Sequence, residues 1–251
     1  SSFMRRDIAV IGPITFLLIW WGVVKYGLVD SFFLPNPVDV LRELSELLQD
    51  GSFLRDSLST LSRVLAAFFI ASIFGVLLGL WLGRLEIWYR SIEFVIDFFR
   101  STPATAMFPL FLLVFGVSDA SKIAVAAFAS MLLIIFNTAH GVMYAKKSRI
   151  RAALIMGATN VQVFRWVLFW ESLPQTFVGL RSALSMSLVV IVAAEMVIGT
   201  SSGLGRRIID AQVTYEIPTM YATILFSGII GYTLNMCFLI FEKRVLHWHE
   251  R

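Results

Sequence analysis

Two charged residues interrupt long apolar runs of the sequence and are the first candidates for chemistry. Arg100 lies well inside the run at residues 92–115, close to its midpoint, and Glu195 lies near the end of a later run. A charge inside a bilayer costs at least about 2.5–3.5 kcal/mol, so such a side chain faces a cavity or a partner. The guanidinium of Arg100 can bind an anion through paired hydrogen bonds, which would place it on an anion route. A structural ion pair with Glu195, or with Asp97 one turn away, is the alternative.

Two prolines, Pro103 and Pro109, divide the run that contains Arg100. Irregular backbone at membrane depth is tolerated where it lines a cavity or is buried in protein. Four residues near these prolines, together with Arg100 and Glu195, are therefore candidates for a translocation pathway: Ser101, Thr102, Thr105 and Met107. A simple kink without a functional role explains the prolines equally well.

A cationic segment follows a later apolar run and reads RAALIMGATNVQVFRWVLFWESLP at residues 151–174. Gly157 interrupts it, and two short helices around a glycine turn would present a knob to a partner protein. A basic loop that contacts anionic lipid is the alternative, and composition alone favours it.

Small residues recur at every fourth position of another apolar run, which places them on one face of a helix. They are Ala71, Gly75, Gly79 and Gly83. Small residues let two membrane helices approach closely. We predict a close helix contact along this face, either within the chain or across a dimer.

Several catalytic motifs are absent from the sequence. No Gly-Lys dipeptide occurs, so there is no phosphate-binding P-loop and the chain is not expected to hydrolyse ATP. Cys237 is the single cysteine, which excludes an internal disulfide and a cysteine-based zinc site. His247 and His249 form an HxH pair without a third ligand nearby, and we predict no metal site.

The composition of the chain indicates the class of protein in which these residues lie. Of 251 residues, 58% are apolar and 15% are charged, whereas soluble chains average about 45–50% and about 25%. A soluble fold of this size cannot bury so much apolar surface. We therefore predict an all-α integral membrane protein with one transmembrane domain at residues 1–251. Secreted enzymes, disordered regulators and nucleic-acid modules are excluded.

The apolar runs predict about six transmembrane helices, since a span needs about 20 apolar residues. They lie at residues 8–28, 65–82, 92–115, 123–142, 173–198 and 220–241. The first is long enough to remain as a span rather than act as a cleaved signal. Residues 30–62 form an outer segment, in which Val38, Leu41, Leu44, Leu47 and Leu48 recur at helical spacing and predict an amphipathic helix.

The distribution of cations predicts the orientation of the spans. With both termini in the cytoplasm, the inner segments hold twelve of the 21 lysines and arginines: Arg5, Arg6, Arg84, Arg90, Lys146, Lys147, Arg149, Arg151, Arg165, Lys243, Arg244 and Arg251. The outer segments hold seven: Lys25, Arg42, Arg55, Arg63, Lys122, Arg206 and Arg207. Cytoplasmic segments carry the excess of cations in membrane proteins, so the segment at residues 144–171 is predicted to be cytoplasmic.

The cytoplasmic segment resembles a known motif. Ala152-Ala153, Gly157 and Leu173-Pro174 are similar to the "EAA" loop of permeases from binding-protein-dependent ABC importers. Eight further segments resemble the nitrate/sulfonate/taurine/bicarbonate branch of these permeases: LPNP at 34–37, SLSTLSRVLAAF at 57–68, FRSTPATAMFPLFLLVFG at 99–116, SKI at 121–123, NTAHG at 137–141, GLR at 179–181, AAE at 193–195 and GLG at 203–205. The resemblance covers nearly the whole chain in the expected order.

This resemblance implies a type I ABC importer permease fold in a bacterial inner membrane. The coupling helix that docks on the ATPase would then involve Arg151, Ala152, Ala153, Gly157, Ala158 and Thr159. It implies two ATPase subunits that hold ATP and Mg²⁺, a second permease chain that we expect to be identical, and a periplasmic or lipid-anchored binding protein. The cargo it implies is a small anion such as nitrate, bicarbonate, taurine or another sulfonate. Relatives that carry neutral or aromatic compounds, such as vitamin precursors, keep a second cargo class open.

The sequence departs from the family pattern at three positions. Arg151 reverses the charge of the usual glutamate, Trp170 stands where a proline is usual, and Asn235 stands near a frequent aspartate. The reversal at Arg151 leaves open that the partner permease is a non-identical chain.

A secondary carrier would need a matched pair of broken helices, and only one broken run is present. An intramembrane enzyme would need a catalytic cluster, and His140 has no evident partner.

Overall fold

The described chain is built entirely from helices and the loops that connect them. The computed structural model describes the backbone of residues 2–246 and the side chains of residues 11–246, so the His247/His249 pair lies outside the described residues. The α-helices in chain order are α1 (Ser2–Lys25), α2 (Pro37–Leu47), α3 (Gly51–Arg84), α4 (Glu86–Ser101), α5 (Phe108–Phe115), α6 (Asp119–Met143), α7 (Lys147–Ile155), α8 (Asn160–Val163), α9 (Phe169–Val197), α10 (Leu204–Val213) and α11 (Ile217–Val245). A 3₁₀ turn (Ala104–Met107) precedes α5, and a π-helical turn (Phe164–Leu168) joins α8 to α9.

Among the described residues, four helices are long and apolar enough to cross a membrane without interruption. They are α3, α6, the continuous helix Asn160–Val197 and α11. The bent pair of α4 and α5 is a fifth candidate, and the apolar part of α1 that the structure describes, Ile11–Lys25, is shorter than a full span. The six predicted runs therefore correspond to helices, and the third of them is bent rather than straight.

The centre of the molecule is a seam where α3, α6 and α9 pack together. Ala71, Gly75, Gly79 and Gly83 are all buried on the face of α3 that meets α6. A Cβ at Gly79 would lie 2.6 Å from the Cβ of Thr138, and one at Gly75 would lie 2.8 Å from the Cβ of Ile134. The close contact along this face is thus made within the chain, because a larger residue at either position would force α3 away from α6.

The predicted outer segment at residues 30–62 contains the first part of the long helix α3. Asp50 caps α3 by accepting a hydrogen bond from the Ser52 amide, so residues 51–62 belong to the long helix. Its 34 residues extend about 51 Å at 1.5 Å per residue, well beyond the bilayer core. The cap signal at Asp50 marks this start.

The amphipathic helix α2 forms as predicted, and part of its predicted apolar set, Leu44 and Leu47, packs against α1 and α11. Val40 and Leu44 are buried against Ala222 of α11 and Trp20 of α1, whereas Val38 and Leu41 are 58% and 51% exposed. The helix is held at its N-terminus by the Asn36 cap, and this register turns Val40 rather than Val38 toward α11.

The third predicted run is neither one straight span nor a simple kink. The axes of α4 and the segment Ala104–Phe115 differ by 95°. Thr102 caps the end of α4 and Pro103 precedes the 3₁₀ turn. Proline cannot continue the hydrogen-bond ladder of α4, so the chain turns here.

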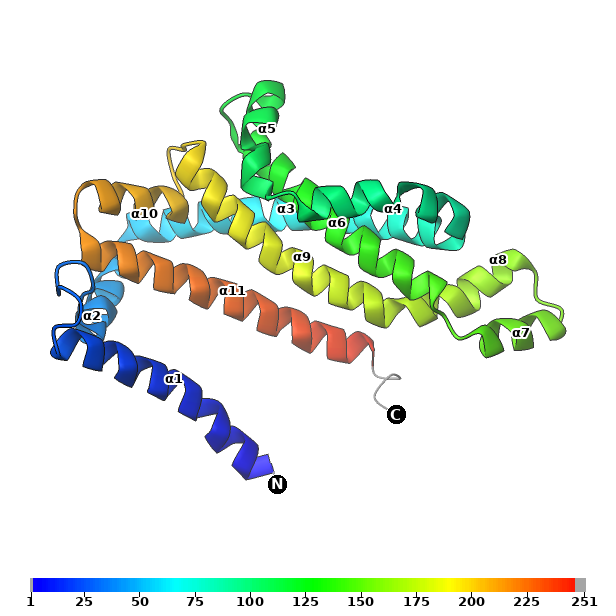
Figure 1. Cartoon of the computed structure of the whole chain (residues 1–251), viewed down its shortest axis with the longest axis horizontal. Coiled ribbons are helices and arrows are strands. Elements are labelled where there is room, and N and C mark those ends of the chain that lie inside the picture. Colours follow the sequence, from blue (N-terminus) through cyan, green and yellow to red (C-terminus); the bar gives the residue numbers. More distant parts are fainter. Residues whose placement is uncertain (1, 247–251) are drawn as a thin grey trace.

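The molecule is elongated, with two distinct ends (Figure 1). The α10 end carries α2, α10 and the loops at residues 26–36 and 198–203, and the α7 end carries α7, α8 and the turn between α3 and α4. The long helices run between these two ends. Arg84, at the end of α3, lies 5.4 Å from the ring centroid of Phe164, which fixes the α3–α4 turn beside α8.

Candidate functional site

The first candidate site is the coupling segment at the α7 end, which we define as residues 147–171. Arg151, Ala152 and Ala153 lie on α7, and Gly157 adopts φ +85°, a left-handed conformation that favours glycine. Thr159 then caps α8 through a reciprocal pair of bonds with Gln162. Ala158 lies half-buried between Gly157 and this cap. The six predicted coupling residues therefore lie in one helix and the turn that follows it.

One part of the predicted two-helix arrangement needs correction. The second helix is not separate, because α8 continues through the π-helical turn into α9, and Asn160–Val197 forms one helix of 38 residues. The turn at Gly157 is thus attached directly to a membrane-spanning helix. Only the short turn at residues 156–159 separates α7 from this continuous helix.

Two large apolar side chains of α7 and the turn after it lack cover within the chain. Ile155 and Met156 are each 86% exposed, and α7 has no buried residue. An ion pair between Arg149 and Glu171 fastens α7 to the start of α9. A cavity of about 490 Å³ opens beside it, lined by Val161, Phe164, Arg165, Trp166, Phe169 and Trp170. Exposed apolar groups of this kind mark an interaction surface.

The second candidate site is the bend between α4 and α5. Arg100 pairs with Asp97 at 3.0 Å, and its guanidinium lies 3.7 Å from the ring centroid of Phe136 on α6. The predicted alternative pair of Arg100 with Glu195 is wrong. Ser101 and Thr105 are exposed, Thr102 is half-buried, and Met107 is 7% exposed within the core.

The third candidate site is a network of buried charges near the α10 end. Glu195 is 1% exposed, and its Oε1 lies 2.6 Å from Nη1 of Arg63 on α3. Thr60 donates to the same carboxylate at 2.9 Å, and the amide of Gly205 donates at 3.0 Å. Glu195 therefore has its carboxylate satisfied inside the chain and does not face an open surface.

Arg63 connects Glu195 to two further elements. It is 5% exposed and forms a 2.9 Å ion pair with Asp119 at the start of α6. It also donates to the carbonyl of Ser202 at 2.8 Å. Asp119 pairs in turn with Lys122 at 3.2 Å. Two cations and two anions thus fasten α3, α6, α9 and the loop before α10.

Sequence reasoning missed Arg63, Thr60 and Asp119 as members of this site. Thr60 and Arg63 lie in the segment at residues 57–68 that resembles the permease family, but the sequence does not show that they meet Glu195. The signal that could have identified Thr60 is its place among positions 53, 57, 60, 64 and 67, which recur at helical spacing and are all buried. A polar residue on a buried helix face requires a partner, and Glu195 is that partner.

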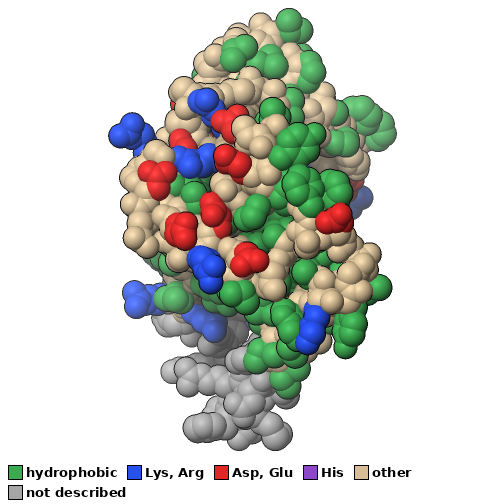
Figure 2. Space-filling model, turned by 90° about the vertical axis from the view of Figure 1, so that its left-hand side faces the viewer, with side chains coloured by type: hydrophobic (Ala, Val, Ile, Leu, Met, Phe, Trp, Pro, Cys, Tyr) green, Lys and Arg blue, Asp and Glu red, His purple; other side chains and the backbone are tan. Residues whose placement is uncertain are grey.

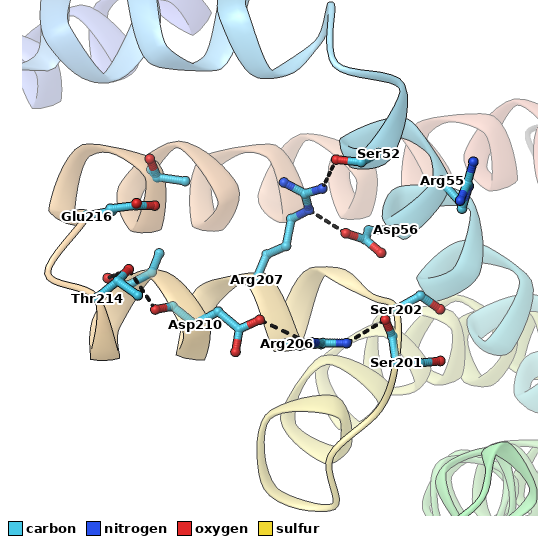
Figure 3. Close-up of a pocket in the computed structure, with 12 residues that line it drawn as sticks. Ser52, Arg55, Asp56, Ser201, Ser202, Arg206, Arg207, Asp210, Thr214 and Glu216 are labelled. Atoms are coloured by element: carbon cyan, nitrogen blue, oxygen red, sulfur yellow. Dashed lines mark hydrogen bonds and ion pairs between the residues drawn. The ribbon is translucent and has the colours of Figure 1, made fainter.

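The fourth candidate site is a cavity of about 450 Å³ at the α10 end (Figure 3). Arg207 reaches across it from α10 to Asp56 of α3, and Arg206 pairs with Asp210 at 3.1 Å. Acidic and basic side chains are interspersed over this end of the molecule (Figure 2). The cavity is open and polar, in contrast to the apolar cavity of the coupling segment.

Comparison with known proteins identifies the family. Residues 56–247 match the family described as binding-protein-dependent transport system inner membrane component. The chain belongs to this family. The permease is 34% identical to a probable ABC transporter permease protein of Brucella abortus, over 92% of this chain and 91% of the relative. It is 30% identical to the taurine transport system permease protein TauC of Escherichia coli, over 98% of this chain and 91% of the relative.

Other relatives and solved structures agree on the class of protein. Permeases named for aliphatic sulfonates in Bacillus subtilis, nitrate in Synechocystis and riboflavin in Chloroflexus aurantiacus are 25%, 27% and 29% identical. An inward-facing structure of the MetNI methionine ABC transporter matches with a TM-score of 0.63 and 20% identity, over 78% of this chain and 99% of that chain. The permease has the type I importer fold and is a membrane subunit that carries no ATPase of its own.

Proposed function

We propose that the permease works as one of two permease subunits in an importer powered by two ATPase subunits. Each ATPase would bind ATP and Mg²⁺, and each would contact one permease through the coupling segment. The observation that carries this proposal is the exposed apolar pair Ile155 and Met156 beside the turn at Gly157. Large apolar side chains exposed on a polar segment are stabilised when a partner covers them.

The proposed orientation places the α7 end and both termini in the cytoplasm. Lys146, Lys147, Arg149 and Arg151 gather on or beside α7, and such clusters are retained on the cytoplasmic side of membranes. The α10 end then faces the periplasm of a bacterial inner membrane. This orientation puts the coupling segment in the compartment that contains ATP.

A substrate-binding protein is proposed to dock on the α10 end. The open polar cavity there carries Arg55, Arg206 and Arg207 together with Asp56 and Asp210. Interspersed charges favour a partner with a complementary pattern and accelerate its association. The ion network of Arg63 and Glu195 lies beneath this surface and keeps the loop before α10 in one position.

The proposed cargo is a small oxyanion, such as a sulfonate or nitrate. The support is the relatedness to permeases named for taurine, aliphatic sulfonates and nitrate. The bend residues Arg100, Ser101, Thr102 and Thr105 are proposed to lie on or beside the pathway, with Met107 packed behind them. A second candidate is a neutral or aromatic compound, which the relative named for riboflavin favours.

The test of the complex is its native mass and subunit composition. The permease is expressed with the ATPase encoded beside it and purified in mild detergent. We expect two 28.3 kDa permeases with two ATPase chains, and ATP turnover that rises when the binding protein is added with taurine or nitrate. A permease that purifies alone under these conditions would contradict the proposal.

A matched pair of variants tests the docking surface. Ile155→Asp places a charge in the exposed apolar pair and should remove the ATPase from the purified complex. Ile87→Asp is the control, because Ile87 is 81% exposed at the start of α4, at the same end of the molecule. Equal loss of ATPase from both variants would show that the coupling segment is not the specific contact.

A further inference from the structure

The exposed face of α9 differs in chemistry from the exposed face of α3. Between residues 172 and 190, the exposed positions of α9 recur at alternating steps of three and four: Gln175, Val178, Ser182, Ser185 and Val189. Between residues 69 and 81, the exposed positions of α3 are all apolar: Phe69, Ile70, Ile73, Phe74, Leu77, Leu78 and Trp81. The α3 face is suited to lipid, whereas polar side chains at membrane depth face water or protein.

Part of this α9 face is hollowed into a trough. The trough has a volume of about 510 Å³, within the range of small-molecule sites, and is lined by Leu133, Arg181, Ser182, Ser185, Met186, Val189 and Asn235. Ser185 lies 12 residues before the end of α9, or about 18 Å along the axis, near the centre of a bilayer. Three helices, α6, α9 and α11, therefore form a hollow at mid-membrane depth that is lined by four polar and three apolar side chains.

Three of the four polar side chains that line the trough form no hydrogen bond within the described part of the chain. Arg181 forms a long ion pair with Glu242, in which Nη1 lies 3.8 Å from Oε2, and its side chain is 37% exposed. This separation is too long for a hydrogen bond. Ser185 and Asn235 form no hydrogen bond with any described residue, whereas Ser182 donates to its own helix. A guanidinium, a hydroxyl and an amide are thus left with free donors in one hollow. This set of donors is suited to the oxygens of an oxyanion.

We propose that this trough is half of a solute site on the translocation pathway, and that Arg181 selects oxyanions there. The inference rests on the proposed importer, in which a second permease would cover the trough from the opposite side. Asn235 lines the trough with a neutral amide, and Glu242, which pairs with Arg181, is not among the residues that line it. Phe136, which supports Arg100, lies one turn from Leu133 on α6. The bend and the trough therefore flank the same face of α6.

Thiol labelling tests whether the trough is lined by water. Cys237 is the single cysteine, so Cys237→Ser provides a background without cysteine. Ser185→Cys reports on the trough, and Ile73→Cys is the control on α3. The two positions lie at similar depth, since Gly75 meets Ile134 and Ser130 of the same helix bonds Ser187. Both cysteine variants are labelled in membrane vesicles that contain the complex with the ATPase.

Labelling uses two water-soluble methanethiosulfonates of opposite charge, the sulfonatoethyl and the trimethylammonioethyl reagents. We expect Ser185→Cys to react with both, and Ile73→Cys to remain almost unlabelled. Relative to a free thiol, the anionic reagent should be favoured at Ser185→Cys by about threefold. The guanidinium of Arg181 lines the trough, whereas the carboxylate of Glu242 that pairs with it does not. Arg181→Gln should remove the preference, whereas Arg181→Lys should keep most of it.

The outcomes separate this inference from the proposed function. Unreactive Ser185→Cys in a complex that retains its ATPase would overturn the trough while leaving the importer intact. Reactive Ser185→Cys with a charge preference that survives Arg181→Gln would overturn the selective role of Arg181. Loss of the ATPase from the background protein itself would instead contradict the proposed complex. A rate at Ser185→Cys no higher than at Ile73→Cys also overturns the inference.

Discussion

The two ends of the permease are stabilised in opposite ways. At the α10 end, Arg63 and Glu195 are 5% and 1% exposed, and their charges are paired with each other and with backbone groups. At the α7 end, the coupling segment leaves Ile155 and Met156 exposed, and one ion pair of Arg149 with Glu171 holds α7. The buried charges of the first end are satisfied within the chain, whereas the second end presents apolar groups that a partner can cover.

This difference indicates how a movement at one end of the chain can reach the other end. A buried charge network has one satisfied arrangement, because each unpaired group would leave an uncompensated charge. The loop before α10 is therefore fixed to α3, α6 and α9 as one unit. The coupling segment is joined to the same core through the continuous helix Asn160–Val197. A displacement of α7 should thus move α9, and the loop before α10 should move with it.

The largest effect is expected from removing one partner of the buried charge network at the α10 end. Glu195→Ala removes the carboxylate that Arg63, Thr60 and Gly205 share, and leaves Arg63 buried beside Asp119 alone. We expect the variant to lose about 3–5 kcal/mol of folding free energy, which is typical when one partner of a buried pair is removed. The measurement is the melting temperature and yield of the purified protein. Arg206→Ala is the control, since its pair with Asp210 is exposed and should contribute little.

The second largest effect is expected in the coupling segment at the α7 end. Gly157→Arg places a side chain on a left-handed backbone and crowds the surface that would meet the ATPase. Uptake should be lost while the helices remain inserted and folded. Gly27→Arg is a matched control, because Gly27 also has a left-handed φ, of +65°, and open space around it. Normal uptake by Gly157→Arg would contradict the coupling role of this turn.

A smaller effect is expected at the bend, which lies between the two ends. Arg100→Ala removes a partly exposed pair with Asp97 and the contact with Phe136. Assembly should be retained while uptake of the transported anion falls. Arg100→Lys should keep part of the activity, since it keeps the charge but loses the planar guanidinium. Loss of the assembled complex in Arg100→Ala would instead assign Arg100 a structural role.

The smallest effect concerns the cap of α3 at the α10 end. The side chain and amide of Ser52 donate to Asp50 and hold the pKa of its carboxyl below the ordinary value of 3.8. The contribution of this cap is therefore present at neutral pH and lost as pH falls through the lowered pKa. We expect Asp50→Ala to speed hydrogen exchange in the first turn of α3 at neutral pH. At a pH below the lowered pKa, the amides in the first turn of α3 should exchange equally fast in the unsubstituted protein and in Asp50→Ala. A difference that persists there would contradict the role of the charge.

Much of the fold follows from local patterns in the sequence. The long apolar runs became α3, α6, α9 and α11 because apolar length alone determines what can cross a bilayer. The prolines marked the break after α4, and Gly157 marked the turn in the coupling segment. The apolar spacing predicted that α2 is amphipathic, but it did not single out Val40, which is buried while Val38 is exposed, because one helix offers two overlapping apolar faces. The packing of α11 decides between them.

Contacts between distant segments could not be read from spacing. The sequence by itself determined that this is a multi-pass membrane permease and that glycines lie on one face of α3. Only the tertiary structure decided that those glycines meet α6, that Glu195 pairs with Arg63 rather than Arg100, and that Arg181, Ser185 and Asn235 share one hollow. Helical periodicity assigns a residue to a face, whereas its partner depends on how helices far apart in the chain pack and cross.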